Sequence, residues 1–163
     1  MAELKKFATF GDFIKFNLDY VYSNHLLTYH LEQTIIRVKK EEVDLFKFFN
    51  VIDENCYVTV LLVRDGCLVY ATHANDEVVA KVAEGLEFKK FKAYTFFGTK
   101  NVLTPLFQKN DVVYTIAKER TIYECKEVNA GFVYSHGALS MGDPNCLPEL
   151  AEFNRQFSKE WYD

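Results

Sequence analysis

Four histidines and four cysteines are the residues of this chain best suited to acid–base, nucleophilic or metal chemistry. His25 and His30 fall on one predicted helix, about 140° apart around its axis, so they do not share a face. His73 follows a predicted strand and His136 lies in a glycine-rich stretch, and neither has a serine or cysteine nucleophile near it in the sequence. A catalytic triad would need a tertiary contact that the sequence does not reveal. No catalytic residue and no metal site are therefore predicted.

The cysteines are scattered, without a Cys-x-x-Cys pair, and three of them lie in apolar runs: Cys56, Cys67, Cys125 and Cys146. This pattern predicts buried thiols in a reduced compartment, because a buried free cysteine behaves as a small hydrophobic residue. Cys125 lies beside Glu124 and Glu127, whose carboxylates disfavour the thiolate that a nucleophile needs. The acidic residues do not have the spacing of a calcium-binding loop.

Composition excludes further classes of protein. The 163 residues are 49% hydrophobic and 26% charged, with a net charge of −4. Without a long basic block we expect no nucleic-acid partner, since phosphate recognition needs clustered lysine and arginine. No segment approaches the ~20 consecutive apolar residues of a membrane span. The opening MAELKKFATF lacks the apolar run of a signal peptide, so no membrane association and a cytoplasmic location are expected.

The stretch Cys56–His73 is the clearest structural signal. Two apolar runs flank Arg64-Asp65-Gly66, which predicts a β-hairpin in which glycine supplies the positive φ of the turn. The first run is apolar almost without alternation, which is typical of a strand covered on both faces. We therefore expect helices on both sides of a sheet.

The remaining pattern completes an α/β fold with a mixed, largely antiparallel sheet and helices on both faces. Residues 41–55 fit either a short helix or an irregular apolar segment, and the other predicted elements are helices near 9–23, 24–40, 75–86 and 99–107 and strands at 93–97 and 112–125. Pro105 lies inside the fourth helix, which must be short or kinked there.

Three regions are predicted. Residues 1–128 form an α/β domain, and residues 129–146, rich in glycine and small side chains, form a linker. Residues 147–163 form a helix that begins near Pro148, where a missing N–H costs little. Its apolar face needs a partner surface, so the helix either packs back or opens a second domain; that face is Leu147, Leu150, Phe153, Phe157 and Trp161.

Two segments carry a resemblance to a known family. The opening FGDFIKFNLDYVYSNHLLTYHLEQTI resembles the helical pair that begins two-domain GNAT-superfamily acyltransferases, and the predicted order of elements over 9–125 is similar to their amino-terminal half. The closing NCLPELAEFNRQFSKEWYD resembles the first helix of their second, catalytic domain. The resemblance implies a GNAT-like (acyl-CoA N-acyltransferase) half-fold in a family of acetyl-CoA-dependent N-acetyltransferases.

The sequence departs from that family in one motif. A Gln/Arg-x-x-Gly-x-Gly/Ala run, whose backbone N–H groups hold the pyrophosphate of acetyl-CoA at a helix start, is not found in the 163 residues. The predicted hairpin instead leads into Ala74-Asn75-Asp76-Glu77, whose carboxylates repel phosphate. No cofactor-binding residue is predicted, acetyl-CoA is not expected to bind this chain alone, and catalysis by this chain is an open question.

The resemblance thus implies a scaffold for an acetyl-CoA-dependent half lying beyond this chain. Its expected partners are a carboxy-terminal catalytic GNAT domain or a second copy of itself. The resemblance also places Phe157, Trp161 and Tyr162 on the substrate side, bordering the acyl-acceptor site, with simple packing as the other reading. The alternative function is a non-enzymatic interaction or dimerisation module that uses the apolar helix at 147–161.

Overall fold

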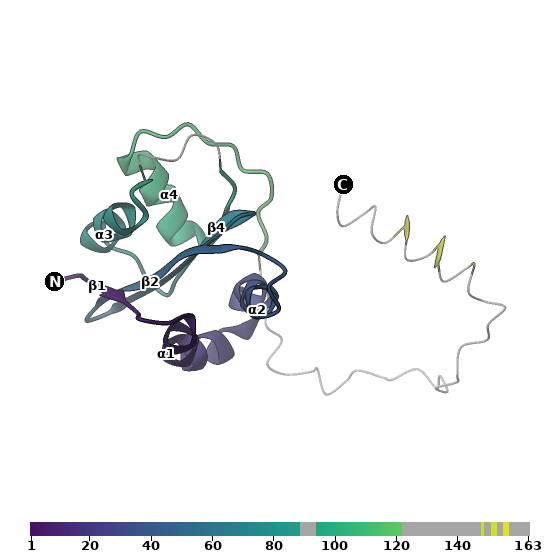
Figure 1. Ribbon diagram of the computed structural model, residues 1–163. Coiled ribbons are helices and arrows are strands. Elements are labelled where there is room, and N and C mark those ends of the chain that lie inside the picture. Colours follow the sequence, from purple (N-terminus) through teal and green to yellow (C-terminus); the bar gives the residue numbers. More distant parts are fainter. Residues whose placement is uncertain (89–93, 122–147, 149–150, 153–154, 157–163) are drawn as a thin grey trace, which may run out of the picture. The chain divides into compact units, whose positions relative to one another are not determined.

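The computed structural model describes residues 1–88 and 94–121 and, near the carboxy terminus, residues 148, 151–152 and 155–156. The chain divides into two compact units, Met1–Tyr123 and Glu124–Asp163. The fold described below is that of the first unit (Figure 1).

A five-stranded sheet forms the centre of this unit, with strand order β1-β2-β3-β4-β5. The first four strands pair antiparallel with their neighbours, and β5 pairs parallel with β4. The sheet is therefore mixed and largely antiparallel, as the sequence predicts. The strands are β1 (Glu3–Lys6), β2 (Leu45–Asp53), β3 (Cys56–Val63), β4 (Gly66–Ala71) and β5 (Phe96–Gly98).

Four helices cover the sheet on both faces, which confirms the second part of the predicted fold class. Helices α1 (Phe10–Ser23) and α2 (His25–Lys39) lie on one face, and α3 (Asp76–Leu86) and α4 (Lys100–Lys109) on the other (Figure 1). The Thr9 hydroxyl caps α1 by accepting a hydrogen bond from the Asp12 N–H. Only Asn24 separates α1 from α2.

The predicted hairpin is present as β3 and β4, with Val63 paired to Gly66. Every residue of both strands is buried except the half-buried Tyr57. Gly66 does not have the positive φ expected of it. Glycine is required there by close packing, since a Cβ would lie 2.7 Å from the ring of Phe97 and 3.1 Å from the Thr95 carbonyl oxygen.

One side chain differs from expectation at the start of α4. The segment after Asn75 and the one after Thr99 are both helical, as predicted, but the Thr99 hydroxyl does not cap α4. It accepts a hydrogen bond of 3.0 Å from the Ala71 N–H and so joins the end of β4 to the start of α4. Pro105 lies within α4, which continues to Lys109.

The observed strands differ from the predicted ones in several places. Residues 41–55 contain strand β2 rather than a helix or irregular segment, because pairing with both β1 and β3 and cover on both faces remove the alternation that would reveal it. Strand β1, short and polar, was not predicted. The aromatic strand at 93–97 is present as Phe96–Gly98; residue 93 lies outside the described residues.

The predicted strand at 112–125 is wrong over its described part, since residues 112–121 form neither strand nor helix. The chain instead turns back along α4. The Val112 N–H donates to the Phe107 carbonyl at 3.1 Å, the Tyr114 ring lies 4.7 Å from the Phe107 ring, and Glu119 pairs with Lys100 at 2.7 Å. Alternating residues favour a strand only where a neighbouring strand offers hydrogen bonds. Residues 122–125 lie outside the described residues.

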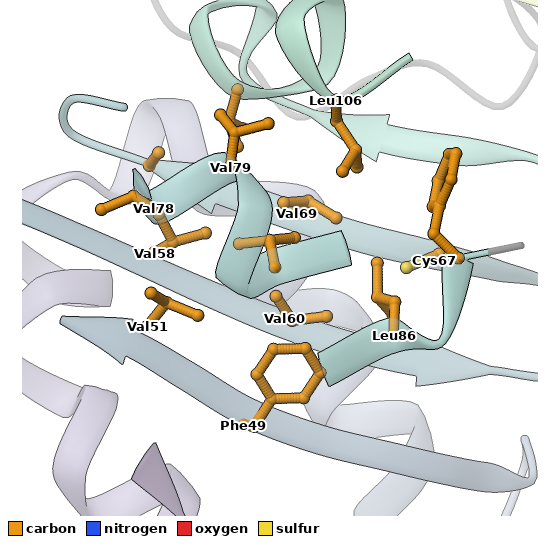
Figure 2. Packing of buried hydrophobic residues seen from close by; sticks show 14 of the residues in the cluster. Phe49, Val51, Val58, Val60, Cys67, Val69, Val78, Val79, Leu86 and Leu106 are labelled. Atoms are coloured by element: carbon orange, nitrogen blue, oxygen red, sulfur yellow. The ribbon is translucent and has the colours of Figure 1, made fainter. Parts of the chain in front are cut away.

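The core has two layers of different composition. Beneath α3 and α4 it is built mainly of valine and leucine, and Figure 2 shows these side chains meeting between the sheet and the helices: Val51, Val58, Val60, Val69, Val78, Val79, Leu86 and Leu106. Beneath α1 and α2 the buried cluster contains larger rings, including Phe13 and Tyr70, and partly buried Phe7, Phe10 and Phe48 pack against it.

Candidate functional site

A group of buried polar side chains lies beneath α1, and we call it the polar cluster: Asn17 of α1, Asn50 of β2, and Tyr57 and Thr59 of β3. Asn17, Asn50 and Thr59 are each at most 1% exposed. Burial of amide and hydroxyl groups costs free energy unless they are hydrogen-bonded, so such a group needs a complete set of partners.

Local structure places these residues together. Asn17 is four residues from Phe13 and from Val21, and the three side chains form the buried stripe of α1. Asn50 and Thr59 are directly paired across β2 and β3, so their side chains lie on the same face of the sheet.

The hydrogen bonds of the polar cluster are reciprocal. The two asparagine amides donate to each other at 3.0 and 2.9 Å. The Asn50 amide also donates to the Thr59 hydroxyl at 2.8 Å, and the Thr59 and Tyr57 hydroxyls both donate to the Asn17 carbonyl oxygen, the latter at 2.8 Å. The second Asn17 amide hydrogen reaches the Phe13 carbonyl at 2.8 Å. Each side-chain amide and hydroxyl in the cluster therefore has a partner.

Tyrosines border the cluster. The Tyr20 ring lies 4.8 Å from that of Tyr57, and the Tyr20 hydroxyl is buried with no hydrogen-bond partner among the described residues. Burial raises the pKa of Tyr20 and of Tyr57 above the usual range and raises the pKa of Tyr70 to about 12. All these phenols stay protonated at neutral pH. The cluster contains neutral groups only, so it can fix the position of α1 but is not equipped for acid–base chemistry.

The start of α3, which follows the β3–β4 hairpin, is a strand-to-helix turn of the kind that can bind an anion. Here the Asn75 side chain accepts a hydrogen bond of 2.9 Å from the Val78 N–H, and the first turn carries the carboxylates of Asp76 and Glu77. A helix start attracts anions through its free N–H groups and dipole. At the start of α3 the Asn75 side chain and the carboxylates of the first turn already interact with these groups.

Further contacts close the same end of α3. The Glu77 carboxylate accepts a hydrogen bond of 2.9 Å from the Ala2 N–H, and the Asp53 carboxylate accepts one of 3.1 Å from the Asn75 amide. Asp53 also pairs with the ammonium group of Met1 at 3.0 Å. These hydrogen bonds hold the pKa of Asp53 below its usual value. Three carboxylates thus lie around the start of α3, and two of them are paired with cations of the chain: Asp53 with the Met1 ammonium group and Asp76 with Lys109 at 2.7 Å.

In the described part of the chain, none of the histidines forms a hydrogen bond with a serine or cysteine side chain. The His30 ring lies 4.5 Å from the Phe97 ring, and burial together with the charges of Arg37 and Arg120 lowers the pKa of His30. Cys56 and Cys67 are free and buried, as predicted. Burial raises the pKa of Cys67, which makes it unreactive.

Several predicted residues lie outside the described residues: Phe157, Trp161, Tyr162, His136, Cys125 and Cys146. Within the described ranges, no His, Cys, Asp or Glu side chains form a group of three that could hold a metal ion. Among the same residues, no helix is both long and apolar enough to cross a membrane.

The comparisons with known proteins give no match: no family model fits the sequence, and neither the curated proteins nor the solved structures contain a significant relative.

The sequence analysis missed the polar cluster, although a signal for it was present. Asn17 occupies a position on the apolar stripe of α1, and Asn50 interrupts the apolar run Phe48-Phe49-Asn50-Val51-Ile52. A polar residue at a position predicted to be buried indicates a hydrogen-bonded partner elsewhere in the fold.

Proposed function

We propose that this chain is the amino-terminal half of a GNAT-like N-acetyltransferase and that it serves as a scaffold for an acetyl-CoA-dependent half beyond Asp163. In this proposal the chain binds its partner domain and leaves cofactor binding and chemistry to it. The chain itself carries out no chemical step and contributes by holding the partner domain.

One observation carries the proposal, namely the order of elements around the sheet. The succession β1-α1-α2-β2-β3-β4-α3-β5-α4 places a helical pair before the hairpin and a helix before and after β5. This order is similar to the one on which the resemblance to the acyltransferase half rests. The order differs from the predicted one by the additional strands β1 and β2 and by the absence of a strand over the described residues 112–121.

The start of α3 supports the scaffold role. Asn75, Asp76 and Glu77 occupy the helix start at which a cofactor-binding relative needs free N–H groups. The polar cluster supports it as well, because a complete hydrogen-bond network gives α1 one defined place on the sheet. A domain with fixed surfaces is suited to holding another domain.

Calorimetric titration of the 163-residue chain with acetyl-CoA tests the proposal. We expect no heat beyond dilution, because the chain supplies carboxylates where the pyrophosphate would bind. The double variant Asp76→Asn/Glu77→Gln is the matched control for charge, and it too should bind nothing, since Asn75 still caps the helix. Clear micromolar binding to the unmodified chain would overturn the scaffold assignment.

A second candidate is the interaction module formed by the carboxy-terminal helix. Pro148, Ala151, Glu152, Arg155 and Gln156 are helical and exposed, with Arg155 paired to Glu152 at 2.8 Å. At 100° per residue they occupy the side opposite the apolar positions of the sequence. The fluorescence of Trp161, the single tryptophan, tests this candidate together with light scattering. A monomer whose tryptophan emission is that of a buried indole would contradict partner docking through this helix.

A further inference from the structure

Helix α2 carries a seam of three apolar residues and one glutamine on its outward side. Leu26, Tyr29, Gln33 and Ile36 follow one another at spacings of three, four and three residues, and we call them the α2 seam. Leu26 is 49% exposed, Tyr29 62% and Ile36 37%. This spacing is that of the a and d positions at which two helices pack along a common seam.

The α2 seam does not belong to the core of this unit. The buried residues of α2 are Thr28, Leu31, Thr34 and Ile35. At 100° per residue they lie on the side of the helix opposite the seam. Leu18 and Tyr22 of α1 are also exposed, at 42% and 64%, just before α2 begins. A row of exposed apolar side chains along one side of a helix is typical of a protein–protein contact.

The charges beside the seam select the partner. With Leu26 and Gln33 at a positions, Glu32 is at a g position and Arg37 at an e position. In a parallel helix pair a g residue faces the e residue five positions further along the partner, which joins Glu32 to Arg37 of a second copy. Two-fold symmetry creates this ion pair twice.

An antiparallel pair would give the opposite result. With Leu26 set against Ile36 of the second copy, Glu32 would lie nearest to Glu32 of that copy, and like charges would face each other. The seam itself favours a parallel register, because in that register Gln33 meets Gln33 and their amides can hydrogen-bond.

The contact that Arg37 already makes is compatible with a second one. Its guanidinium pairs with Asp65 at 2.9 Å through one nitrogen, and the side chain is 42% exposed. A guanidinium has five N–H donors, so it can bind Asp65 and a carboxylate of another chain together.

We propose that a second copy of this chain docks on the α2 seam and forms a two-fold symmetric dimer with parallel α2 helices. The charges favour a second copy of this chain over a different protein, because α2 contains both the acidic and the basic member of the ion pair, Glu32 and Arg37. This dimer uses neither the carboxy-terminal helix nor any acyltransferase chemistry, so it stands or falls independently of the proposed function.

Sedimentation velocity of the full 163-residue chain over a range of concentrations tests the proposal. We expect a dimer that dissociates on dilution. Tyr29→Glu places a carboxylate in the seam and should weaken dimerisation by about a hundredfold or more, and Glu32→Lys, which sets lysine against arginine twice, by about tenfold. The double variant Glu32→Lys/Arg37→Glu restores the pair with reversed charges and should return the dissociation constant to within about threefold of the wild-type value.

The control is Glu54→Lys, the same charge change at the exposed turn between β2 and β3, which should leave the dimer unchanged. Circular dichroism and the unfolding temperature of each variant report whether it is folded; if Tyr29→Glu does not fold, the charge-reversal pair decides alone. A chain that stays monomeric up to roughly 100 µM would overturn the proposal, well above the micromolar range of specific association. The proposal would also be overturned if Tyr29→Glu left the dissociation constant of the dimer unchanged, or if the double variant dimerised as weakly as Glu32→Lys. Either result would indicate that another surface forms the dimer.

Discussion

The two faces of the sheet are built by different physical means. Beneath α3 and α4, valine and leucine side chains fill the space. Their burial stabilises the fold, but because the hydrophobic effect is non-directional it does not by itself specify how a helix is placed. Beneath α1, the polar cluster joins Asn17 of the helix to Asn50 and Thr59 of the sheet by directional hydrogen bonds. The comparison indicates that apolar burial stabilises both faces, whereas the polar cluster also specifies where α1 must lie.

The largest expected effect on stability comes from truncating a fully buried leucine on either face of the sheet: Leu106 of α4 or Leu31 of α2. We expect Leu106→Ala and Leu31→Ala each to lower the free energy of unfolding by about 3 kcal/mol, because each removes a buried side chain and leaves a cavity. Urea denaturation monitored by circular dichroism measures both. A loss of less than about 1 kcal/mol at Leu106 would contradict the closely packed valine face.

The next prediction concerns the polar cluster, which is present on one face of the sheet only. Asn50→Leu removes the hydrogen bonds that Asn50 makes to Asn17 and to Thr59, so we expect a loss of about 2 kcal/mol from polar groups left without partners. Adding Asn17→Leu should recover part of that loss, because the two amides no longer need each other. Strictly additive losses in this double-mutant cycle would show that the amides are not coupled.

A smaller loss is expected at Gly85, where α3 packs closely against the sheet. A Cβ at Gly85 would lie 2.6 Å from a methyl carbon of Leu4 and 2.7 Å from the ring of Phe49. We expect Gly85→Ala to destabilise by about 1 kcal/mol, because overpacking outweighs the gain in helix propensity. A rise in the unfolding temperature would mean that α3 packs more loosely than the structure shows.

The smallest expected effect concerns the tyrosines beside the polar cluster. Tyr20→Phe removes a buried hydroxyl without a partner among the described residues and should stabilise by up to about 1 kcal/mol. Tyr57→Phe, the matched change, removes the hydrogen bond to Asn17 and should destabilise by a similar amount. Equal effects of the two variants on the unfolding temperature would contradict this contrast.

A third tyrosine, the buried Tyr70, makes the stability of the fold depend on pH. A phenol is neutral when protonated, and burial raises the pKa of Tyr70 from 10.0 to about 12 in the folded state. Its contribution to stability is therefore complete below pH 10 and is lost as pH rises towards 12, at about 1.4 kcal/mol per pH unit. Tyr70→Phe should flatten the alkaline decline in the unfolding free energy.

Local signals predicted much of the fold. The sequence alone identified the hairpin at 56–73, the two helices before it and the helix after Asn75, because capping residues, the Asp-Gly turn and helical spacing all act within a few residues. Strand β2 was not recognised, since cover on both faces hides its alternation. Residues 112–121 show the opposite case. Their apolar and polar residues alternate, but they do not pair with a described strand and so do not form one.

The candidate site was harder to predict. Whether Asn17 meets Asn50 depends on how α1 crosses the sheet, and that is a matter of tertiary register rather than spacing. The closed start of α3 was predictable in part, because Asp76 and Glu77 are visible in the sequence as carboxylates in a first turn. The contacts from Ala2 and Asp53 to this helix start come from distant parts of the chain.

Amide hydrogen exchange with and without acetyl-CoA tests the scaffold assignment most directly, because it reports on every element at once. We predict that the first turn of α3, around Val78, exchanges at the same rate in both samples, because Asn75 and its neighbouring carboxylates already occupy that helix start. New protection of this turn in the presence of acetyl-CoA would show that the chain binds the cofactor itself, and it would contradict the scaffold assignment.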